Sequence, residues 1–376
     1  MKELLGRFSS ILADPYRRAR EWKEKGGKVI GVTPMHFPEE LIHAGGALPV
    51  VLQESDEPVT AGYGYLYPFY CGFTRSTVDV AVKGKLGLFD ALVISDMCLQ
   101  IRHMAYIMRR NMPATPFVYI QWPLAVRGAG WLGFTAERLK RCRAELERII
   151  GNKIEDAAIR DSISVYNRNR ALLKRLYALR EKKTGVLSGG EVLAVTAASM
   201  LMPKEEHSAL LEELLRELEA TQASRNGGVP LFVSGHLCQA VKTDILTLIE
   251  AVGGMVVADD LYTGYRYFAT DADTSIPPLE ALARRYLDLA VPCPTRADPE
   301  GDWGEYLVRV AREVGAKGII SLVAKFCEPH MIYYPYLREV LMAAGIPHLL
   351  IETEHEVVSL AGVRTRLQAF LEMIGQ

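Results

Sequence analysis

The feature that most constrains the fold is a regular alternation of short apolar runs with longer stretches of helical periodicity. Runs of this length that are rich in Val, Ile and Leu are typical of buried strands. Helices between the runs supply the crossovers that parallel strands require, so the alternation predicts parallel α/β sheets. The expected strands are residues 28–33, 48–52, 91–95 and 116–121 in the first third, and 230–234, 255–258, 318–323 and 347–352 in the last third.

The middle of the chain has no strand pattern. Residues 134–150, 154–181 and 204–223 have helical periodicity, and Gly189-Gly190-Glu191 is typical of a helix start. The predicted fold class is therefore α/β, with two lobes, each holding a roughly four-stranded parallel sheet, joined by a helical insert. The expected domains are residues 1–133, 134–226 and 227–376.

The cysteines occupy related places in the two lobes. Cys98 and Cys327 each follow the third strand of a lobe, while Cys71 and Cys293 each lie between the second and third strands. Ligands of open α/β sheets bind at the carboxyl ends of the strands. Two lobes with facing strand ends would therefore place Cys71, Cys98 and Cys327 in one cleft.

Composition excludes several classes of function. The 376 residues carry a net charge of −1, which gives no global attraction to nucleic acid or to an anionic membrane. No run approaches the roughly 20 apolar residues of a membrane helix, and no secretory leader is recognisable. We therefore expect a cytoplasmic protein whose six cysteines are thiols or metal ligands rather than disulfides.

Two kinds of metal centre fit the cysteines. Thiolates that converge from strand ends suit an iron–sulfur cluster, for which Cys71, Cys98 and Cys327 would supply three of four ligands. Zinc is the rival, because Cys327 and His330 have C-x-x-H spacing and other histidines, His103 and His355, are available.

The other three cysteines have weaker cases as ligands. Cys142 lies on an apolar helix stripe and is expected to pack in the core, and packing is also favoured for Cys238. Cys293, in Val-Pro-Cys-Pro, fits a ligand, a residue next to the ligands, or neither.

Polar residues beside the expected strand ends are candidates for chemistry. Thr33, His36 and Glu40 follow the first strand, where the start of a helix at Pro38 can receive a polar group. Tyr262 follows the second strand of the second lobe as a possible proton donor.

Three further residues follow the cysteines. Arg75 and Ser76 come after Cys71, and Arg102 comes after Cys98, where they can contact a cluster or coenzyme A phosphates. Ordinary solvated or helix-start roles are the alternative for each. The chain has neither a phosphate-binding G-x-x-x-x-G-K-[ST] run nor a G-x-G-x-x-G turn, so any ATP would be hydrolysed by another protein.

Five motifs in order resemble the 2-hydroxyacyl-CoA dehydratase and benzoyl-CoA reductase family. They are Pro38-x-Glu40-Leu-Ile-x-Ala-x-Gly46-x-Leu-Pro, Cys71-x-x-x-Arg75-Ser, Asp90-Ala-Leu-Val-Ile-x-x-x-Cys98, Asp259-Asp260-Leu-Tyr-Thr-Gly and Phe326-Cys327-Glu-Pro. The segments 166–170 and 205–207 look most like the smaller cluster-bearing subunit of class I benzoyl-CoA reductase.

The resemblance implies two α/β lobes with a [4Fe–4S] cluster between them, held by Cys71, Cys98 and Cys327. A related branch carries a double-cubane cluster and needs extra cysteines. In this chain Tyr262 stands at one of those positions, which favours a single cubane, although Cys293 matches a cysteine of that branch.

The implied activity is that of a subunit of an ATP-dependent benzoyl-CoA-type reductase, which reduces an acyl-CoA through a ketyl radical. The expected partners are a homologous second subunit, an ATP-hydrolysing iron–sulfur activator and the acyl-CoA substrate. His36, Glu40 and Tyr262 are the catalytic candidates, and Thr33, Arg75, Ser76 and Arg102 the substrate-binding candidates. A subunit of a radical (R)-2-hydroxyacyl-CoA dehydratase and a non-catalytic iron–sulfur electron-transfer partner are the alternatives.

Overall fold

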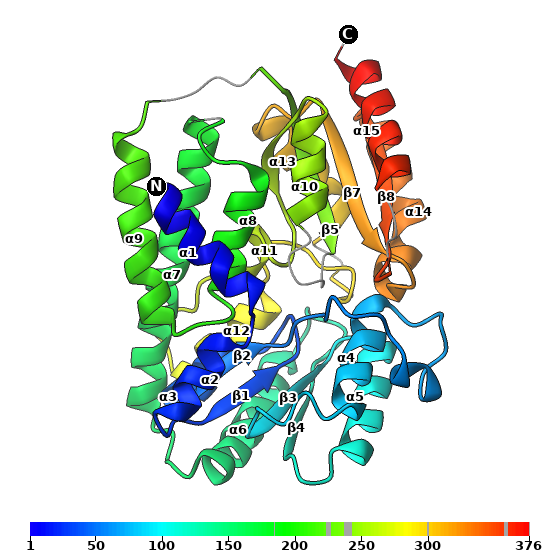
Figure 1. The fold of residues 1–376 in the computed structure, drawn as a ribbon. Coiled ribbons are helices and arrows are strands. Elements are labelled where there is room, and N and C mark those ends of the chain that lie inside the picture. Colours follow the sequence, from blue (N-terminus) through cyan, green and yellow to red (C-terminus); the bar gives the residue numbers. More distant parts are fainter. Residues whose placement is uncertain (184, 223–226, 237–242, 299–300, 357–359, 376) are drawn as a thin grey trace.

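The computed structural model describes residues 1–183, 185–222, 227–236, 243–298, 301–356 and 360–375, and it contains two four-stranded parallel sheets (Figure 1). The first sheet has the order β2 (Leu48–Val51), β1 (Val29–Val32), β3 (Ala91–Asp96), β4 (Phe117–Gln121). The second has the order β6 (Gly254–Asp259), β5 (Val229–His236), β7 (Gly318–Ala324), β8 (His348–Thr353). The predicted fold class is confirmed, and the two sheets share one strand order.

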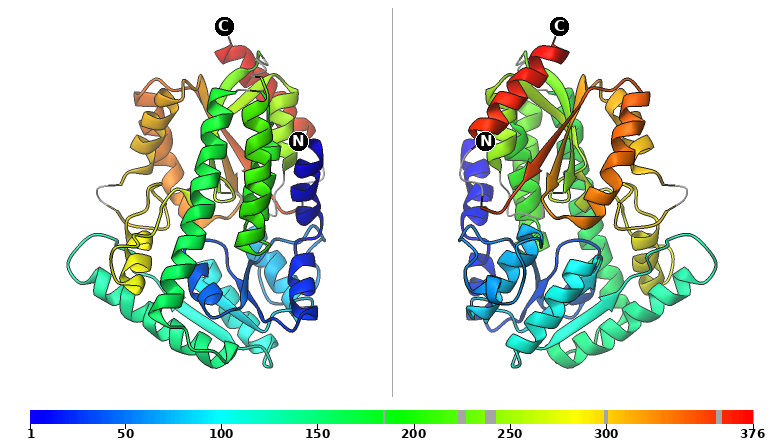
Figure 2. Two further views of the ribbon diagram at one scale, coloured as in Figure 1. Left: turned by 90° about the vertical axis from the view of Figure 1, so that its left-hand side faces the viewer. Right: turned by 90° about the vertical axis from the view of Figure 1, so that its right-hand side faces the viewer.

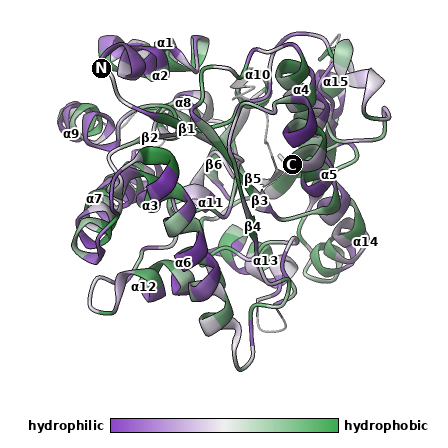
Figure 3. Ribbon diagram, turned by 90° about the horizontal axis from the view of Figure 1, so that it is seen from below, coloured by the Kyte–Doolittle hydropathy of each residue, from purple (hydrophilic) through white to green (hydrophobic). Residues whose placement is uncertain are grey.

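Helices cover the sheets and connect them. The first lobe contains α3 (Glu39–Ala44), the 3₁₀ turn η1 (Ala61–Gly64), α4 (Gly72–Val82) and α5 (Leu99–Asn111). The second contains α10 (Thr243–Ala251), α11 (Tyr265–Phe268), α12 (Pro278–Leu287), α13 (Trp303–Glu313), α14 (Glu328–Ala343) and α15 (Ala361–Ile374). Seen from below, the apolar strands of the first sheet run through the centre with helices on both sides (Figure 3).

The insert consists of α6 (Trp131–Ile150), α7 (Asp156–Lys182), α8 (Gly189–Ala198) and α9 (Lys204–Ala220). The long helices α7 and α9 run side by side along the flank of both lobes (Figures 1 and 2). At the start of α8 the predicted helix signal takes the form of a capping box, in which Ser188 and Glu191 satisfy each other's backbone N–H groups.

Segments far apart in the sequence share cores. The N-terminal helix α1 (Lys2–Ala13) packs on α8 and α9, whereas α2 (Arg17–Glu24) lies against the first sheet. Helix α12 packs on α6 and α7, and its Leu282 and Tyr286 join one apolar cluster with Ile30 of β1. The predicted domain boundaries therefore stay a prediction.

Among the described residues, no helix combines the length and the apolar character that crossing a lipid bilayer requires.

Candidate functional site

Three cysteines stand at the starts of three helices. Cys71 is the N-cap residue of α4, Cys98 that of α5 and Cys327 that of α14. Helices α5 and α14 follow directly on the buried strands β3 and β7, which occupy the same place in their two sheets. The N-terminal end of a helix carries partial positive charge and unpaired N–H groups, so all three thiols lie where negative charge is favoured.

The three cysteines line one pocket between the lobes, with about 670 Å³ of empty space that is partly open to solvent. Both sheets contribute to its wall through the loops that follow their strands. This pocket is here called the cysteine pocket. The other residues of its wall are Pro34, Glu54, Gly72, Phe73, Met97, Gln100, Ile101, Thr295, Ala324, Glu328, Pro329, Thr353 and His355. The lobes thus meet at the carboxyl ends of their strands.

Gln100 connects two of the cysteine segments. Its side-chain oxygen accepts a hydrogen bond of 2.7 Å from the backbone N–H of Cys71, and its Nε2 donates one of 2.6 Å to the carbonyl of Phe326. Phe326 has a φ of 63°, a left-handed conformation that is strained for a residue with a side chain. The loop before Cys327 is therefore held in an unusual conformation from across the lobe boundary.

Burial dominates the electrostatics of the thiols. It raises the pKa of the Cys98 thiol to about 11 and also raises the pKa values of Cys71 and Cys327. The charge of each neighbouring thiolate acts in the same direction, since Cys71 raises the pKa of Cys98, and both raise the pKa of Cys327. Three thiolates can therefore coexist here only with compensating positive charge, and a bound metal supplies such charge.

Within the described part of the chain, no group of three or more His, Cys, Asp or Glu side chains is close enough to hold a single metal ion. Cys327 and His330 are neighbours, with 3.4 Å between Sγ and Nδ1, but His103 bonds the Tyr70 hydroxyl and His355 bonds Glu54. In an iron–sulfur cubane each thiolate ligates a different iron, so its ligands stand farther apart than those of one ion. Three thiols that line one pocket are a donor set that an iron–sulfur cluster can use.

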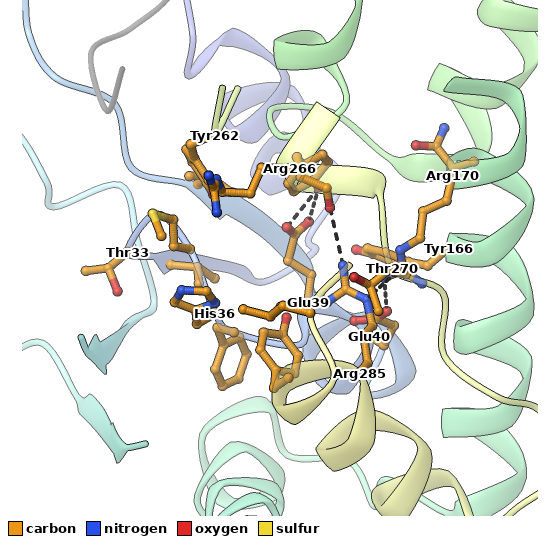
Figure 4. A pocket seen from close by; sticks show the side chains of 18 of the residues that line it. Thr33, His36, Glu39, Glu40, Tyr166, Arg170, Tyr262, Arg266, Thr270 and Arg285 are labelled. Carbon is orange, nitrogen blue, oxygen red and sulfur yellow. Dashed lines mark hydrogen bonds and ion pairs between the residues drawn. The ribbon is translucent and has the colours of Figure 1, made fainter. Parts of the chain in front are cut away.

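A second pocket, here called the charged pocket, lies between the first lobe, the insert and the segment after β6 (Figure 4). It has about 710 Å³ of empty space that is partly open to solvent. Figure 4 shows Glu39, Glu40, Arg170 and Arg285 gathered toward one side, and Thr33, His36 and Tyr262 toward the other. Aromatic side chains complete much of the wall, namely Phe37, Tyr166, Tyr267 and Tyr286.

Ion pairs organise the charged pocket. Glu40, which is 1% exposed, pairs with Arg170 of α7. Burial alone would raise the pKa of Glu40, but the guanidinium groups of Arg170 and Arg285 outweigh burial and lower it. Glu40 is therefore a fixed anion at neutral pH.

Glu39 has two partners in the same pocket. Lys204 of α9 lies 3.4 Å away, and the Tyr267 hydroxyl donates a hydrogen bond of 2.8 Å to Oε1. Burial lowers the pKa of Lys204, and the charge of Glu39 acts against that effect. The pKa of Tyr267 lies well above its usual value because of burial and the charge of Glu39, so its hydroxyl stays a donor.

The structure brings three predicted residues to the charged pocket, two of them on the wall that it shares with the cysteine pocket. Thr33 and His36 line the charged pocket, while Pro34 between them lines the cysteine pocket. His36 Nε2 lies 3.5 Å from the Thr295 hydroxyl of the cysteine pocket, and His36 has a strained φ of 58°. Tyr262 lines the charged pocket from the opposite lobe.

Arg75, Ser76 and Arg102 bond to other parts of the protein. Arg75 pairs with Glu354 and donates to the Tyr70 carbonyl and the Tyr63 hydroxyl. The Ser76 hydroxyl accepts from the Ser55 N–H. Arg102 bonds Asp96 at the rim, with 55% of its side chain exposed. Their predicted substrate contacts stay predictions, as do the other site assignments.

The remaining cysteines differ in setting. Cys142 is buried in the core beside Leu139 and Leu146, which confirms its predicted packing role. Cys293 is also buried, and its Sγ lies 3.0 Å from the Thr295 hydroxyl rather than on the wall of the cysteine pocket. Cys238 lies outside the described residues.

Sequence reasoning missed four residues that organise these pockets. Gln100 follows a cysteine but belongs to no motif. The sequence indicates only that Lys204 is the first residue of a helix. Arg170 ends the segment 166–170 and Arg285 lies beside the exposed Arg284, but only the tertiary fold shows that both line this pocket.

Comparison of the chain with known protein families gives a match over most of its length. A family model described as "2-hydroxyglutaryl-CoA dehydratase, D-component" matches residues 34–374. The chain belongs to this family. The family prediction is therefore confirmed, and the site described above is that of a 2-hydroxyglutaryl-CoA dehydratase D-component family member.

Relatives of this family member match it over nearly its whole length. The (R)-phenyllactyl-CoA dehydratase beta subunit of Clostridium sporogenes is 28% identical, covering 98% of this chain and 97% of the relative. A benzoyl-CoA reductase subunit of Thauera aromatica is 26% identical, covering 99% of this chain and 98% of the relative. The (R)-2-hydroxyglutaryl-CoA dehydratase beta subunit of Acidaminococcus fermentans is 28% identical, covering 99% of both proteins.

Proposed function

We propose that the chain is the [4Fe–4S] cluster-bearing subunit of an ATP-dependent benzoyl-CoA-type reductase that acts on an acyl-CoA through a ketyl radical. The observation that carries the proposal is the meeting of Cys71, Cys98 and Cys327 at three helix starts around one pocket. A relative named as part of a benzoyl-CoA reductase supports the reaction class.

In this proposal Cys71, Cys98 and Cys327 hold the cluster. When bound, it supplies one-electron transfer at low potential. The protein contributes the setting: helix starts that favour negative charge, apolar walls from Phe73, Met97 and Ile101 that limit water, and Gln100 that fixes two ligand segments.

The proposed roles of the other residues follow from their places. His36 and Tyr262, which line the charged pocket from different lobes, hold or move protons, and the fixed anion Glu40 sets the charge around them. Thr33 lies beside His36 on the wall that the pockets share. Arg75 and Ser76 on α4 and Arg102 on α5 are the proposed contacts of the substrate.

A homologous second subunit and an ATP-hydrolysing iron–sulfur activator are the proposed partners. Exposed apolar side chains beside the cysteine helices support a protein partner, because soluble monomers rarely expose such a group together. Phe69, Leu99, Met331 and Ile332 line one surface hollow there, and Ile332 is 73% exposed.

The test begins with iron and sulfide analysis of anaerobically purified protein and EPR after reduction with dithionite. We expect about four irons and four sulfides per chain, as one cubane requires. Cys71→Ala should lose the intact cluster signal, whereas the matched variant Cys142→Ala, which removes a buried thiol outside the pocket, should keep it. An unchanged signal in Cys71→Ala would refute the ligand assignment.

A subunit of a radical (R)-2-hydroxyacyl-CoA dehydratase is the second candidate, since two relatives at 28% identity are named as dehydratase beta subunits. The complex, supplied with activator, ATP and reductant, separates the candidates. A dearomatised product from benzoyl-CoA supports the reductase, and an enoyl-CoA from (R)-2-hydroxyacyl-CoA supports the dehydratase. Iron without any spectral response to either acyl-CoA supports a non-catalytic electron-transfer partner.

A further inference from the structure

A row of aromatic rings leads from the cysteine pocket to the surface of the second lobe. It begins at His330, whose Nδ1 lies 3.4 Å from the Sγ of Cys327. The His330 ring contacts the Trp303 ring with 5.2 Å between centroids, and the Trp303 ring contacts that of Tyr333 with 5.6 Å. Tyr333 in turn contacts Tyr336 with 5.4 Å. These spacings are those of rings in direct contact.

This aromatic row runs outward from the interior along two packed helices, α13 and α14. Trp303, which is 2% exposed, is the first residue of α13. His330, Tyr333 and Tyr336 follow one another at three-residue spacing on α14, so their side chains share one face of the helix. Tyr336 is 46% exposed, so the row ends in water.

The outer three members of the aromatic row can be oxidised and have places for their protons. Tryptophan and tyrosine lose an electron more easily than other aromatic side chains, and the N–H or O–H group then releases a proton. The Trp303 Nε1–H donates to Oδ2 of Asp260 at 2.7 Å. The Tyr333 hydroxyl donates to Oδ2 of Asp302, also at 2.7 Å. Tyr336 can release its proton to water.

Cys327 is the residue at the inner end that oxidation would harm. Cysteines that lose electrons to oxidants can proceed to sulfinic and sulfonic acids, which ordinary reductants do not reverse. In the proposed function Cys327 is a cluster ligand, so its oxidation would end activity. A nearby electron donor can restore the sulfur before that damage becomes permanent.

We propose that the aromatic row carries oxidising equivalents from Cys327 to the surface at Tyr336, where small reductants in solution remove them. This protective activity goes beyond the proposed catalysis, and it rests on the proposed function only in treating Cys327 as a cluster ligand. His330 supplies the contact between the sulfur and the Trp303 indole.

Each step moves one electron inward and leaves the protons balanced. When a one-electron oxidant has left a thiyl radical at Cys327, Trp303 gives it an electron, and the indole proton passes to its carboxylate partner. Tyr333 then gives an electron to Trp303, which recovers its proton, while the phenol proton passes to the next carboxylate. Tyr336 restores Tyr333 in the same way and releases its proton to water. A thiol or ascorbate finally returns one hydrogen atom to Tyr336.

The first experiment starts the oxidation at the inner end of the full chain. Cys71→Ala and Cys98→Ala together leave Cys327 as the remaining cysteine on the wall of the cysteine pocket, and a thiol-reactive flavin is attached to it. The flavin in its excited state takes one electron from the protein. EPR after rapid freezing detects the radical that remains, and ring-deuterated tyrosine identifies it as tyrosyl.

We expect a tyrosyl radical on Tyr336 in the labelled chain. Tyr333→Phe and Tyr336→Phe keep the rings but remove the oxidisable hydroxyls, so each should lose most of this signal. Tyr334→Phe is the matched control, because it changes a neighbouring tyrosine of α14 whose ring contacts His348, and its signal should equal that of the parent. Circular dichroism and the melting temperature establish that each variant is folded. If Tyr333→Phe does not fold, the exposed Tyr336→Phe decides.

The second experiment uses the unlabelled chain, purified anaerobically with the metal that it holds. The protein is exposed to a thermal source of peroxyl radicals in the presence of ascorbate. Mass spectrometry then measures the fraction of Cys327 that has become sulfinic or sulfonic acid. Tyr333→Phe should raise this fraction, and Tyr334→Phe should leave it as in the wild type.

A labelled chain without a tyrosyl radical would overturn the proposal, as would a signal that survives both Tyr333→Phe and Tyr336→Phe or is lost equally in Tyr334→Phe. Equal oxidation of Cys327 in Tyr333→Phe and the wild type would overturn the protective role. The flavin-labelled chain lacks two proposed cluster ligands, so failure of the cluster assignment would leave the first experiment unchanged.

Discussion

At the scale of the residue, His207 shows how burial fixes a protonation state. It lies on α9 with no exposed surface, and its ring contacts Phe8 edge-on. Nε2 donates to the carbonyl of Val195 at 2.8 Å, and the Asn169 amide donates to Nδ1 at 2.8 Å. This pattern requires the neutral ring, and burial lowers the pKa of His207 to about 3.

The pH dependence of stability follows from that shift. The pKa is about 3 in the folded chain and 6.5 without burial, so the contribution of His207 is present above pH 6.5 and is lost as pH falls below it. We expect the free energy of unfolding to fall by about 1.4 kcal/mol per pH unit below pH 6.5 because of this group. His207→Gln should remove that slope in urea unfolding from pH 7.5 to 4.5.

The control is His103→Gln, which changes an exposed histidine and should leave the slope as in the wild type. Equal slopes in His207→Gln and the wild type would show that His207 does not titrate in this way.

At the scale of the element, Gly235 determines how β5 meets β7. It has a φ of 116°, and its N–H donates to Asp260 at 3.0 Å. A Cβ atom at this position would stand 2.1 Å from the carbonyl oxygen of Leu322 in β7. Only glycine combines this conformation with so close an approach of two strands.

Gly235→Ala should therefore lower the free energy of unfolding by roughly 3 kcal/mol or more, from backbone strain and from the collision with β7. Gly253→Ala is the control, because Gly253 also has a positive φ, of 99°, but has no atom within 4 Å of the added Cβ. It should cost only about 1–2 kcal/mol. Equal losses in the two variants, measured by urea unfolding, would argue against the collision.

Apolar runs predicted the strands well because the central strands, such as β1, β3 and β7, are buried. The expected strand at 28–33 matches β1 (Val29–Val32), and the expected helix at 204–223 matches α9 (Lys204–Ala220). Strand β5 extends beyond the predicted 230–234, because Gly235 and His236 pair with Leu322 and Val323 of β7 although neither is apolar. Pairing with the distant strand β7 sets the end of β5, and the local sequence pattern does not predict it.

The residues of the candidate site also fall into those that the sequence predicts and those that only the fold reveals. The cysteines that follow β3 and β7 could be placed from strand order alone, because parallel strands end at one edge. Lys204 of α9, Tyr267 of α11 and Arg285 of α12 meet Glu39 and Glu40 only in the folded chain. No local spacing encodes such contacts.

At the scale of the whole molecule, polar contacts join the end of β8 to the first lobe beside the cysteine pocket. Glu354 pairs with Arg75 of α4, which is 5% exposed, and His355 pairs with Glu54. The Val59 N–H donates to Glu356 at 3.0 Å. These contacts fix the relative position of the lobes where Cys71 and Cys327 lie.

Glu354→Gln should weaken this junction, because the largely buried Arg75 guanidinium loses its carboxylate. We expect a loss of about 1.5–3 kcal/mol in the free energy of unfolding and faster hydrogen exchange in α4. Glu352→Gln, at an exposed position of β8, is the control and should change neither quantity. Unchanged exchange in Glu354→Gln would show that the pair does not hold the lobes together.

The division of the cysteines between two lobes also sets an order of events during synthesis. Cys71 and Cys98 leave the ribosome more than 200 residues before Cys327. At about 5–20 residues per second, the early thiols wait roughly 11–51 seconds for the third. A group held by all three can be inserted only after Cys327 has been made, so the thiols of Cys71 and Cys98 must stay reduced during that interval.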